Sequence, residues 1–227
     1  MENKLPKSNI KQVAVLGLGR FGTEVTKALY NYGCEVLAVD ESEEKIYEVA
    51  DFATHTVATN VAEESNLKSI GIADFDAVII AIGDNIQASI ITALICKEMG
   101  VNYIVAKAQN GKHAKVLKKI GVDYVVIPEA DTAIKTARIL THPKINDLIE
   151  IASGYGLAEI EVPGEWTGKP LIDLDIRNKY AVNVLVVISK TGEINANPYG
   201  ATVLTEGSKL IVGGNMDDIG SLSSRLS

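Results

Sequence analysis

The sequence contains little cysteine, and its cysteines have no paired spacing. Cys34 and Cys96 are the two that it has, and both fall on stretches expected to be helical. Isolated cysteines of this kind are typical of reduced thiols in a cytoplasmic protein, because small exported domains depend on disulfides. We therefore expect both thiols to be free, buried and inert.

The sequence also predicts neither an export signal nor a membrane span. The first residues, MENKLPKSNIKQ, are polar and contain no apolar core of the kind that a signal peptide has. The most apolar region, AVIIAIGDNIQASIITALIC, is interrupted by polar residues at 83–85 and by Gln87, which a bilayer would penalise at mid-span. We expect no direct insertion into a membrane.

Positive charge is outnumbered by negative charge. The chain has 22 lysines and arginines against 29 acidic residues, a net charge of −7. Such a chain offers no positive field to a polyanion, so nucleic acid and anionic lipid are poor partners. Its 227 residues, 47% of them hydrophobic, suffice for one full-sized globular domain and a smaller one.

What the sequence does contain is a regular alternation of strand and helix patterns. Residues 12–17 predict a strand, and residues 20–33 predict a helix with apolar side chains at helical spacing. The alternation continues, with strands expected at 35–40, 55–60, 76–82, 102–108 and 123–128, and helices at 42–52, 62–71, 85–100, 113–121 and 129–141. This order predicts an α/β fold: a Rossmann-type, doubly wound parallel sheet with helices on both faces.

The pattern changes in the C-terminal third of the chain. From about residue 151, short strand patterns are separated by Gly, Pro and Asn turns, at 156–162, 182–189, 193–198 and 208–214. The Ala-rich helix before them leads through His142 and Pro143 into another amphipathic stretch, and could carry the chain across to a partner subunit. We place the nucleotide-fold domain with its crossover helix at 1–141 and a small α+β domain at 142–227.

A glycine triplet carries the clearest chemistry. Gly17, Gly19 and Gly22 form G-x-G-x-x-G between a strand and a helix, and Asp40 closes the next strand. The first glycine permits a tight turn, the second lets a diphosphate approach the backbone, and the third allows close helix–sheet packing. A helix that begins near Arg20 would point free N–H groups and its positive dipole end at phosphates. Asp40 would accept hydrogen bonds from ribose hydroxyls.

Two charged residues narrow the expected ligand. Asp40 disfavours a 2′-phosphate by charge repulsion, which leaves ATP, ADP or NAD(H) as ligands. Arg20 lies inside the glycine turn, where its guanidinium can fork onto phosphate oxygens, so it favours ligands with more phosphate charge. The alternative for Arg20 is an exposed side chain at the start of a helix.

Other strand ends of a parallel sheet face the same crevice, so their polar residues are candidates for base, ribose or phosphate contacts. They are Asn60, Gly83, Asp84, Asn85 and Lys107. Lys107 could neutralise phosphate or lie in solvent. Glu129 follows the last strand of the sheet and could hold a divalent cation beside the phosphates or cap the next helix.

The sequence shows no residue pattern typical of a catalytic centre. The histidines His55, His113 and His142 have no metal-ligand spacing to one another or to cysteine. The residues beyond the nucleotide fold offer no Ser-Tyr-Lys or His-Asp arrangement for acid–base work. We expect no enzyme, and retain an NAD(H)-dependent oxidoreductase as the alternative.

Several stretches of the chain resemble a known family. VAVLGLGRFGTEVTKAL, AIGDNIQAS and AKAQNGKHAKVLKKIGVDYVVIPE resemble the RCK (KTN) regulators of bacterial potassium uptake, most closely the cytoplasmic subunit of Ktr-type transporters. The tail from GKPLIDLDIRNKYAVNVL to KLIVGG looks like the C-terminal RCK domain of the same proteins. A regulator of potassium efflux or antiport with the same fold is a further alternative.

The resemblance implies an assembly and a mode of regulation. Such proteins form homodimers that build an octameric ring under a potassium-channel-like membrane subunit, on the inner face of the cell membrane. ATP favours the active form and ADP the inactive one. The implied nucleotide contacts are Gly17, Leu18, Gly19, Arg20, Phe21, Gly22, Asp40, Asn60, Ala81, Ile82, Gly83, Asn85 and Lys107.

Two further ligands are implied by the resemblance. Glu129 matches an acidic position that helps to bind a cation near the γ-phosphates between two subunits. The segment DLDIRNKYAVNVL resembles one that binds cyclic di-AMP at a dimer interface, with matching positions Asp175, Ile176, Arg177 and Asn183 and, more weakly, Pro198. There the arginine would fork onto a phosphate and the asparagine would read an adenine edge. Without the resemblance, the two are an ordinary surface arginine and a turn asparagine.

Overall fold

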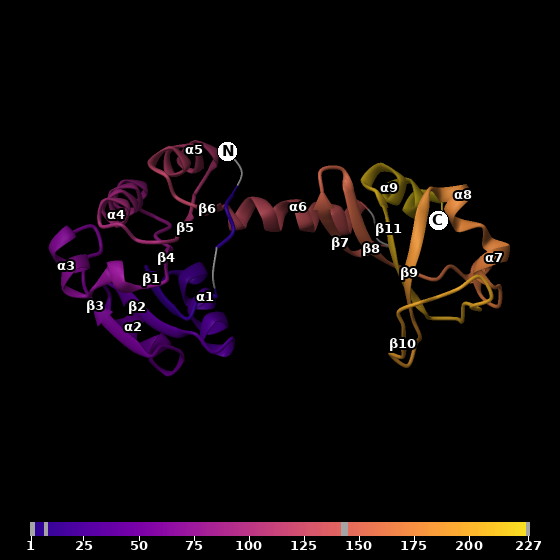
Figure 1. Ribbon diagram of the computed structural model, residues 1–227, viewed down its shortest axis with the longest axis horizontal. Coiled ribbons are helices and arrows are strands. Elements are labelled where there is room, and N and C mark those ends of the chain that lie inside the picture. Colours follow the sequence, from indigo (N-terminus) through magenta and orange to yellow (C-terminus); the bar gives the residue numbers. More distant parts are fainter. Residues whose placement is uncertain (1–2, 7–8, 142–144, 226–227) are drawn as a thin grey trace. The chain divides into compact units, whose positions relative to one another are not determined.

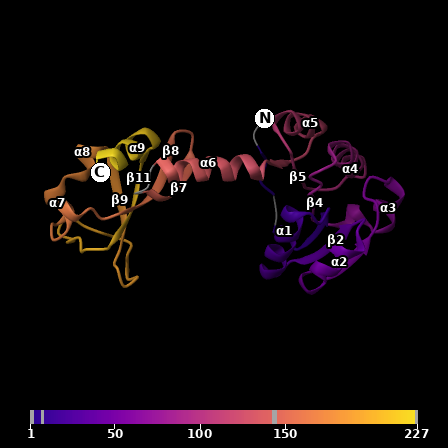
Figure 2. The ribbon, with the colours of Figure 1, turned by 180° about the vertical axis from the view of Figure 1, so that it is seen from behind.

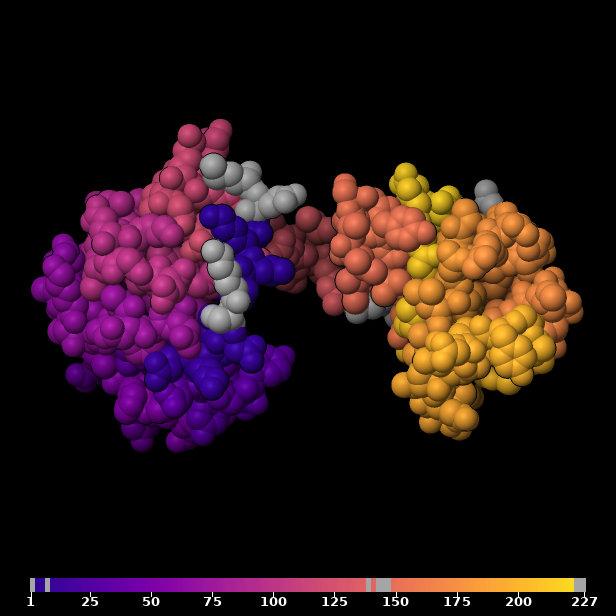
Figure 3. Space-filling model, in the orientation of Figure 1, coloured from indigo at the N-terminus to yellow at the C-terminus, as the bar shows by residue number. Residues whose placement is uncertain are grey.

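The chain folds into two compact units. The computed structural model describes residues 3–6, 9–141 and 145–225, and the units are Met1–Thr132 and Ala133–Ser227. In the space-filling view of Figure 3, the first unit is coloured indigo to magenta and the second mainly orange to yellow, so each is built from one continuous stretch of sequence. A domain border between residues 141 and 142 stays a prediction.

A parallel sheet organises the first unit, and it confirms the predicted fold class. Its six strands lie in the order β3-β2-β1-β4-β5-β6. The chain adds strands outward from β1 in one direction and then, from β4, in the other, and this reversal opens a crevice at the carboxyl ends of the strands. The strands are β1 (Gln12–Leu16), β2 (Glu35–Asp40), β3 (His55–Ala58), β4 (Ala77–Ile80), β5 (Ile104–Lys107) and β6 (Tyr124–Val126).

Helices cover both faces of this sheet. Figures 1 and 2 show α1 (Arg20–Asn31) and α2 (Glu43–Val49) on one side. The other side carries α3 (Glu64–Ser69), α4 (Ile86–Glu98) and α5 (Gly111–Ile120). Short 3-10 turns follow α2 and α3, at η1 (Ala50–Phe52) and η2 (Ile72–Asp74).

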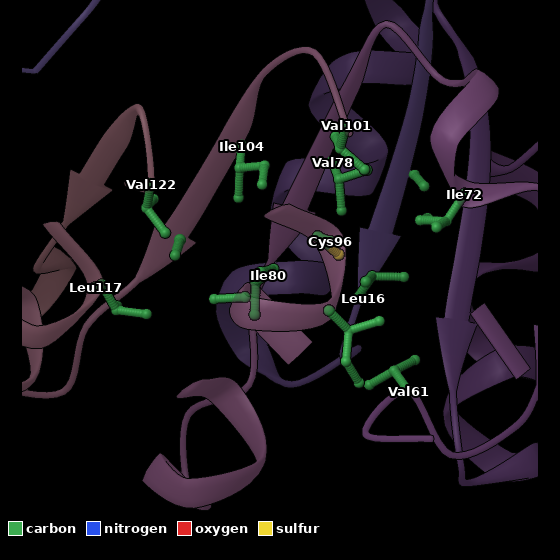
Figure 4. Close-up of a cluster of buried hydrophobic side chains, with 14 of the residues drawn as sticks. Leu16, Val61, Ile72, Val78, Ile80, Cys96, Val101, Ile104, Leu117 and Val122 are labelled. Carbon is green, nitrogen blue, oxygen red and sulfur yellow. The ribbon is translucent and has the colours of Figure 1, made fainter. Parts of the chain in front are cut away.

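The two faces explain why the strands read as unbroken apolar runs. In β1, Val13 and Val15 pack with α1 and α2, whereas Ala14 and Leu16 pack in the cluster of the opposite face. Every residue of this set is buried, because a parallel sheet between two helical layers has no solvent face. Figure 4 shows the cluster between the sheet and α3, α4 and α5, where Leu16, Ile80 and Ile104 from three strands lie around Cys96 of α4.

The cysteines are both free, as expected. Burial of the Cys96 side chain raises the pKa of its thiol to about 12, so this group is not a reactive thiolate. Cys34 does not lie on a helix: α1 ends at Asn31, and Gly33 turns the chain at a positive φ of 81° into β2. Cys34 is also only half-buried, so the expectation of a helical, buried Cys34 was wrong.

The most apolar stretch of the sequence is divided between β4, a loop and α4. Asn85 ends the loop, and its side chain accepts a hydrogen bond from the Ala88 N–H, which caps α4. Within residues 3–6, 9–141 and 145–225, no helix combines the length and the apolarity that crossing a bilayer would require.

An antiparallel sheet organises the second unit. Its strands lie in the order β10-β9-β11-β8-β7. The core under the sheet includes Trp166, Leu204 and Leu210, joined by Ile219 and Leu222 from the last helix. The elements are β7 (Ile145–Ala152), β8 (Tyr155–Glu161), η3 (Gly164–Trp166), α7 (Leu171–Leu174), α8 (Ile176–Tyr180), β9 (Val182–Ile188), β10 (Ile194–Asn195), β11 (Lys209–Asn215) and α9 (Met216–Arg225). The predicted small α+β domain is confirmed.

The junction between the two patterns differs from the prediction. The crossover helix α6 (Pro128–Thr141) is present, but the amphipathic stretch after it is the strand β7, so the second sheet begins before residue 151. β7 pairs antiparallel with β8. The spacing of its apolar residues fits either a helix or a strand, and only pairing with a neighbour selects the strand.

Neighbouring residues of α5 offer a test of the first core. Leu117 is fully buried against the sheet, whereas Val116 is exposed. We expect Leu117→Ala to lower the free energy of unfolding by about 2–5 kcal/mol, because the truncation leaves a cavity. Val116→Ala should change it by less than about 0.5 kcal/mol. Urea unfolding followed by circular dichroism measures both, and equal losses would contradict this packing.

Candidate functional site

A cavity of about 360 Å³ lies at the carboxyl ends of the parallel strands. Its walls come from the residues that end or follow β1, β2, β3, β4 and β5, which is where a doubly wound sheet binds ligands. The lining residues are Gly17, Gly19, Arg20, Phe21, Asp40, Glu41, Lys45, Thr59, Asn60, Val61, Ala62, Ala81, Ile82, Gly83, Asp84, Asn85, Ala88 and Lys107.

The glycine turn is held by close backbone contacts. Gly17 has a φ of 98°, and a Cβ there would lie 3.1 Å from the backbone of Ala81. A Cβ on Gly22 would overlap the carbonyl oxygen of Gly17. Two of the three glycines are therefore required by the fold itself, because they let α1 approach the ends of β1 and β4.

Gly19 differs from the other two glycines. It has an ordinary φ of −71° as the N-cap of α1, and a Cβ there would meet no atom within 4 Å. No acidic side chain lies in the first turn of the helix to bind its free N–H groups. The space beside Gly19 and these donors is thus available to an anion at the amino end of α1.

Asp40 ties the end of β2 to the glycine turn. The residue is 6% exposed, and its carboxylate accepts hydrogen bonds from the N–H groups of Leu18, at 2.7 Å, and Ser42, at 3.0 Å. The ammonium group of Lys45 lies 3.3 Å from Oδ1 and 3.4 Å from Oδ2 of the same carboxylate. The two backbone N–H groups hold the Asp40 carboxylate in place, and Lys45 lies beside it as a partly exposed counter-charge.

The cavity brings together most of the residues predicted from the sequence. Leu18 and Gly22 are the exceptions: the Leu18 side chain is buried in the core, and Gly22 packs against Gly17. Both support the turn without lining the cavity. The sequence analysis missed Glu41, Lys45, Thr59, Val61, Ala62 and Ala88. Their proximity in the chain to Asp40, Asn60 and Asn85 was the available signal.

Lys107 and Glu129 form an ion pair near the cavity. Their Nζ and Oε1 atoms lie 2.8 Å apart, with the lysine largely buried and the glutamate exposed. The hydrogen bond from Lys107 lowers the pKa of the Glu129 carboxyl, and the charge of Arg20 lowers it further. In the part of the chain that the structure describes, no group of three or more His, Cys, Asp or Glu residues could hold a metal ion. A cation at Glu129 stays a prediction.

A second cavity of about 380 Å³ lies in the C-terminal unit. It brings together all five residues predicted for cyclic di-AMP, since its lining is Leu171, Ile172, Asp175, Ile176, Arg177, Val182, Asn183, Val184, Pro198, Tyr199 and Gly200. Arg177 Nε donates to Asn183 Oδ1 at 2.7 Å. Asp175 adopts a left-handed φ of 48° between α7 and α8 and binds Asn178 through its Oδ1.

The histidines show no metal site among the described residues, and His142 lies outside them. His113 on α5 is buried, and its Nδ1 accepts the Gln109 N–H at 3.2 Å. Its Nε2 is buried without a hydrogen-bond partner in the described chain. This burial lowers the pKa of His113, so the residue is held neutral.

Comparisons with known proteins agree with this architecture. The family model of the TrkA-N domain matches residues 13–128, and that of the TrkA-C domain matches residues 157–227. Ktr system potassium uptake protein C of Bacillus subtilis is 44% identical, over 95% of this chain and 97% of that protein. Ktr system potassium uptake protein A of Vibrio alginolyticus is 37% identical, over 94% of this chain and 96% of that protein. These names describe proteins of potassium uptake systems and not enzymes.

Solved structures share the fold at low sequence identity. The GsuK RCK domain superposes with a TM-score of 0.62 at 18% identity, covering 100% of this chain and 50% of that one. The GsuK channel bound to NAD gives a TM-score of 0.61 at 18% identity, over 99% of this chain and 41% of that one. This chain thus spans half or less of those proteins, and the likeness establishes the fold alone.

The two kinds of glycine in the turn give a paired prediction. Gly22→Ala should lower the free energy of unfolding by roughly 1–3 kcal/mol, because the new methyl group must push α1 away from the turn. Gly19→Ala should change it by less than about 1 kcal/mol, since the methyl group enters open space. Urea unfolding measures both. A Gly19→Ala protein as unstable as Gly22→Ala would contradict the assignment of Gly19 to ligand approach.

The buried neutral His113 predicts a pH dependence of stability. Its pKa is lowered in the folded state, so the unfolded chain binds the proton more readily, and stability falls as the pH falls through the unfolded value of about 6.5. The loss reaches at most about 1.4 kcal/mol per pH unit from this group. His113→Asn should unfold with a shallower pH dependence in urea titrations between about pH 7.5 and about pH 5.5. Identical slopes for the two proteins would refute the burial argument.

Proposed function

We propose that this chain, which belongs to the TrkA and Ktr family, is a regulatory subunit of a potassium uptake system controlled by an adenine nucleotide. In this chain, a TrkA-N domain precedes a TrkA-C domain. The observation that carries the proposal is the cavity at the glycine turn, with Gly19 open to it and cationic side chains beside it. The relatives named for potassium uptake cover almost the whole chain.

The cavity matches the parts of an adenine nucleotide in order. Asp40 lies at the end of the second strand, where its carboxylate would contact the ribose. The amino end of α1, together with Arg20 and Lys107, supplies donors and positive charge for phosphates. Apolar lining residues such as Val61 and Ile82 provide a surface for the base. ATP and ADP are the proposed ligands, and NAD(H) is the alternative, since the GsuK channel is described as bound to NAD.

A link from the phosphates to the crossover helix follows from the Lys107–Glu129 pair. Lys107 lines the cavity, and Glu129 belongs to the first turn of α6. A terminal phosphate would compete with Glu129 for Lys107, whereas a ligand that lacks this phosphate would leave the pair closed. Glu129 released in this way is the proposed partner of a divalent cation. Two ligands that bind the two arrangements with different affinity shift their balance.

The assembly implied by the family completes the proposal. Homodimers would build an octameric ring on the cytoplasmic face of a membrane-embedded, potassium-channel-like subunit, which the nucleotide gates through the ring. Cyclic di-AMP would bind in the second cavity, where Arg177 and Asn183 are in contact. The NAD(H)-dependent oxidoreductase remains the rival, because the TrkA-N fold alone does not exclude one. It predicts turnover of a nicotinamide cofactor, and the regulator predicts none.

Calorimetric titration of the full chain tests both ligand sites at once. Arg20→Ala should weaken ATP and ADP by roughly tenfold or more, because a charge-assisted hydrogen bond is lost, and leave cyclic di-AMP unchanged. Arg177→Ala should do the reverse. The two variants control for each other, since each removes one guanidinium from one unit. Failure of the wild-type chain to bind any adenosine phosphate would overturn the nucleotide site.

Gating is tested separately, in vesicles that contain the membrane subunit. Potassium uptake should differ between ATP and ADP at saturating concentration. Equal uptake rates with ATP and ADP, when both are shown to bind, would contradict gating of the membrane subunit and leave only nucleotide binding. If adding this chain changed potassium efflux but not potassium uptake, the efflux alternative would be supported.

A further inference from the structure

Three charged side chains line the end of the cavity where a ribose is proposed to bind, and only Asp40 was expected there from the sequence. Asp40 ends β2, Glu41 follows it, and Lys45 reaches back from the first turns of α2. Two carboxylates and one ammonium group therefore surround the place of a ribose.

The hydrogen bonds of Asp40 are already filled by the chain. Oδ2 accepts the Leu18 N–H, Oδ1 accepts the Ser42 N–H, and Lys45 lies 3.3 and 3.4 Å from the two oxygens. A carboxylate has about four acceptor positions in all. A ribose hydroxyl that binds Asp40 must then displace one of these donors.

Lys45 is the donor that can move. The two N–H groups belong to the backbone of the glycine turn and of the loop before α2, whereas the Lys45 side chain is 46% exposed and flexible. A hydroxyl that displaces its ammonium group leaves that group free beside the ribose. There it can meet whatever the 2′-position carries, because basic side chains at this place accommodate a 2′-phosphate in dinucleotide folds.

We propose that Lys45 is a specificity-determining residue, which competes with the ribose hydroxyls for Asp40 and offsets the repulsion that Asp40 and Glu41 exert on a 2′-phosphate. The proposal rests on the nucleotide site of the proposed function and deepens it. Rejection of a 2′-phosphate is then a balance of three charges rather than a property of Asp40 alone.

The balance predicts opposite effects for two substitutions of similar size. Lys45→Met removes the ammonium group beside Asp40 and Glu41 and keeps the apolar stem, so a 2′-phosphate would meet these two carboxylates without a neighbouring positive charge. Glu41→Gln removes one carboxylate and keeps its shape. Lys45→Arg retains the positive charge and should behave as the wild type.

The experiment measures the dissociation constants of 5′-AMP and adenosine 2′,5′-bisphosphate by calorimetry on the full chain. Their ratio reports the discrimination against a 2′-phosphate and cancels the shared contacts. Lys45→Met should increase the discrimination about tenfold, as expected when one neighbouring charge near the protein surface is removed. The affinity for 5′-AMP should not fall. Glu41→Gln should decrease it. Lys68→Met is the matched control, because Lys68 pairs with Glu64 on α3 and does not line the cavity.

The outcomes separate this inference from the proposal on which it rests. A ratio unchanged by Lys45→Met, with 5′-AMP still bound, would overturn the role of Lys45 and leave the nucleotide site intact. Absence of 5′-AMP and ATP binding to the wild-type chain would overturn the site itself. A loss of both ligands to the same extent in Lys45→Met would show that Lys45 only holds Asp40 in place, which also contradicts the proposal.

Discussion

Close contact between the carbonyl oxygen of Gly17 and the backbone of Gly22 brings the amino end of α1 against the ends of β1 and β4. A side chain at either position would force these elements apart, and the free N–H groups at the amino end of the helix would no longer face the cavity. The buried carboxylate of Asp40 holds the same turn from the other side, through the Leu18 N–H. Gly19, the N-cap of α1, makes no side-chain cap hydrogen bond, and Thr23 Oγ1 adds one further bond to the turn, to the Leu18 carbonyl oxygen.

Charged side chains of both signs line the cavity. Asp40, Glu41 and Lys45 lie at or just after the end of β2, whereas Arg20, Asp84 and Lys107 line the part of the cavity proposed for the phosphates. Lys107 also pairs with Glu129 at the start of α6, so the cavity is connected to the helix that leads out of the first unit. A site built in this way can respond to the number of phosphates as well as to their presence, which is what a nucleotide-controlled regulator needs.

Local patterns in the sequence predicted the elements well and the contacts between distant elements poorly. The apolar runs at β1, β2 and β4 and the glycine triplet are properties of single segments, so spacing was sufficient to find them. The Lys107–Glu129 pair depends on how β5 and α6 meet, which no local spacing encodes. The strand β7 was missed because its apolar residues fit two periodicities, and its partner β8 decides between them.

A crystal structure of the chain grown with ATP tests the central claim most directly. The account predicts phosphate oxygens within about 3 Å of the backbone N–H groups at Gly19 and Arg20, a usual hydrogen-bond distance, and the ribose beside Asp40. Phosphates bound away from the amino end of α1, in a chain whose glycine turn is unchanged, would contradict it.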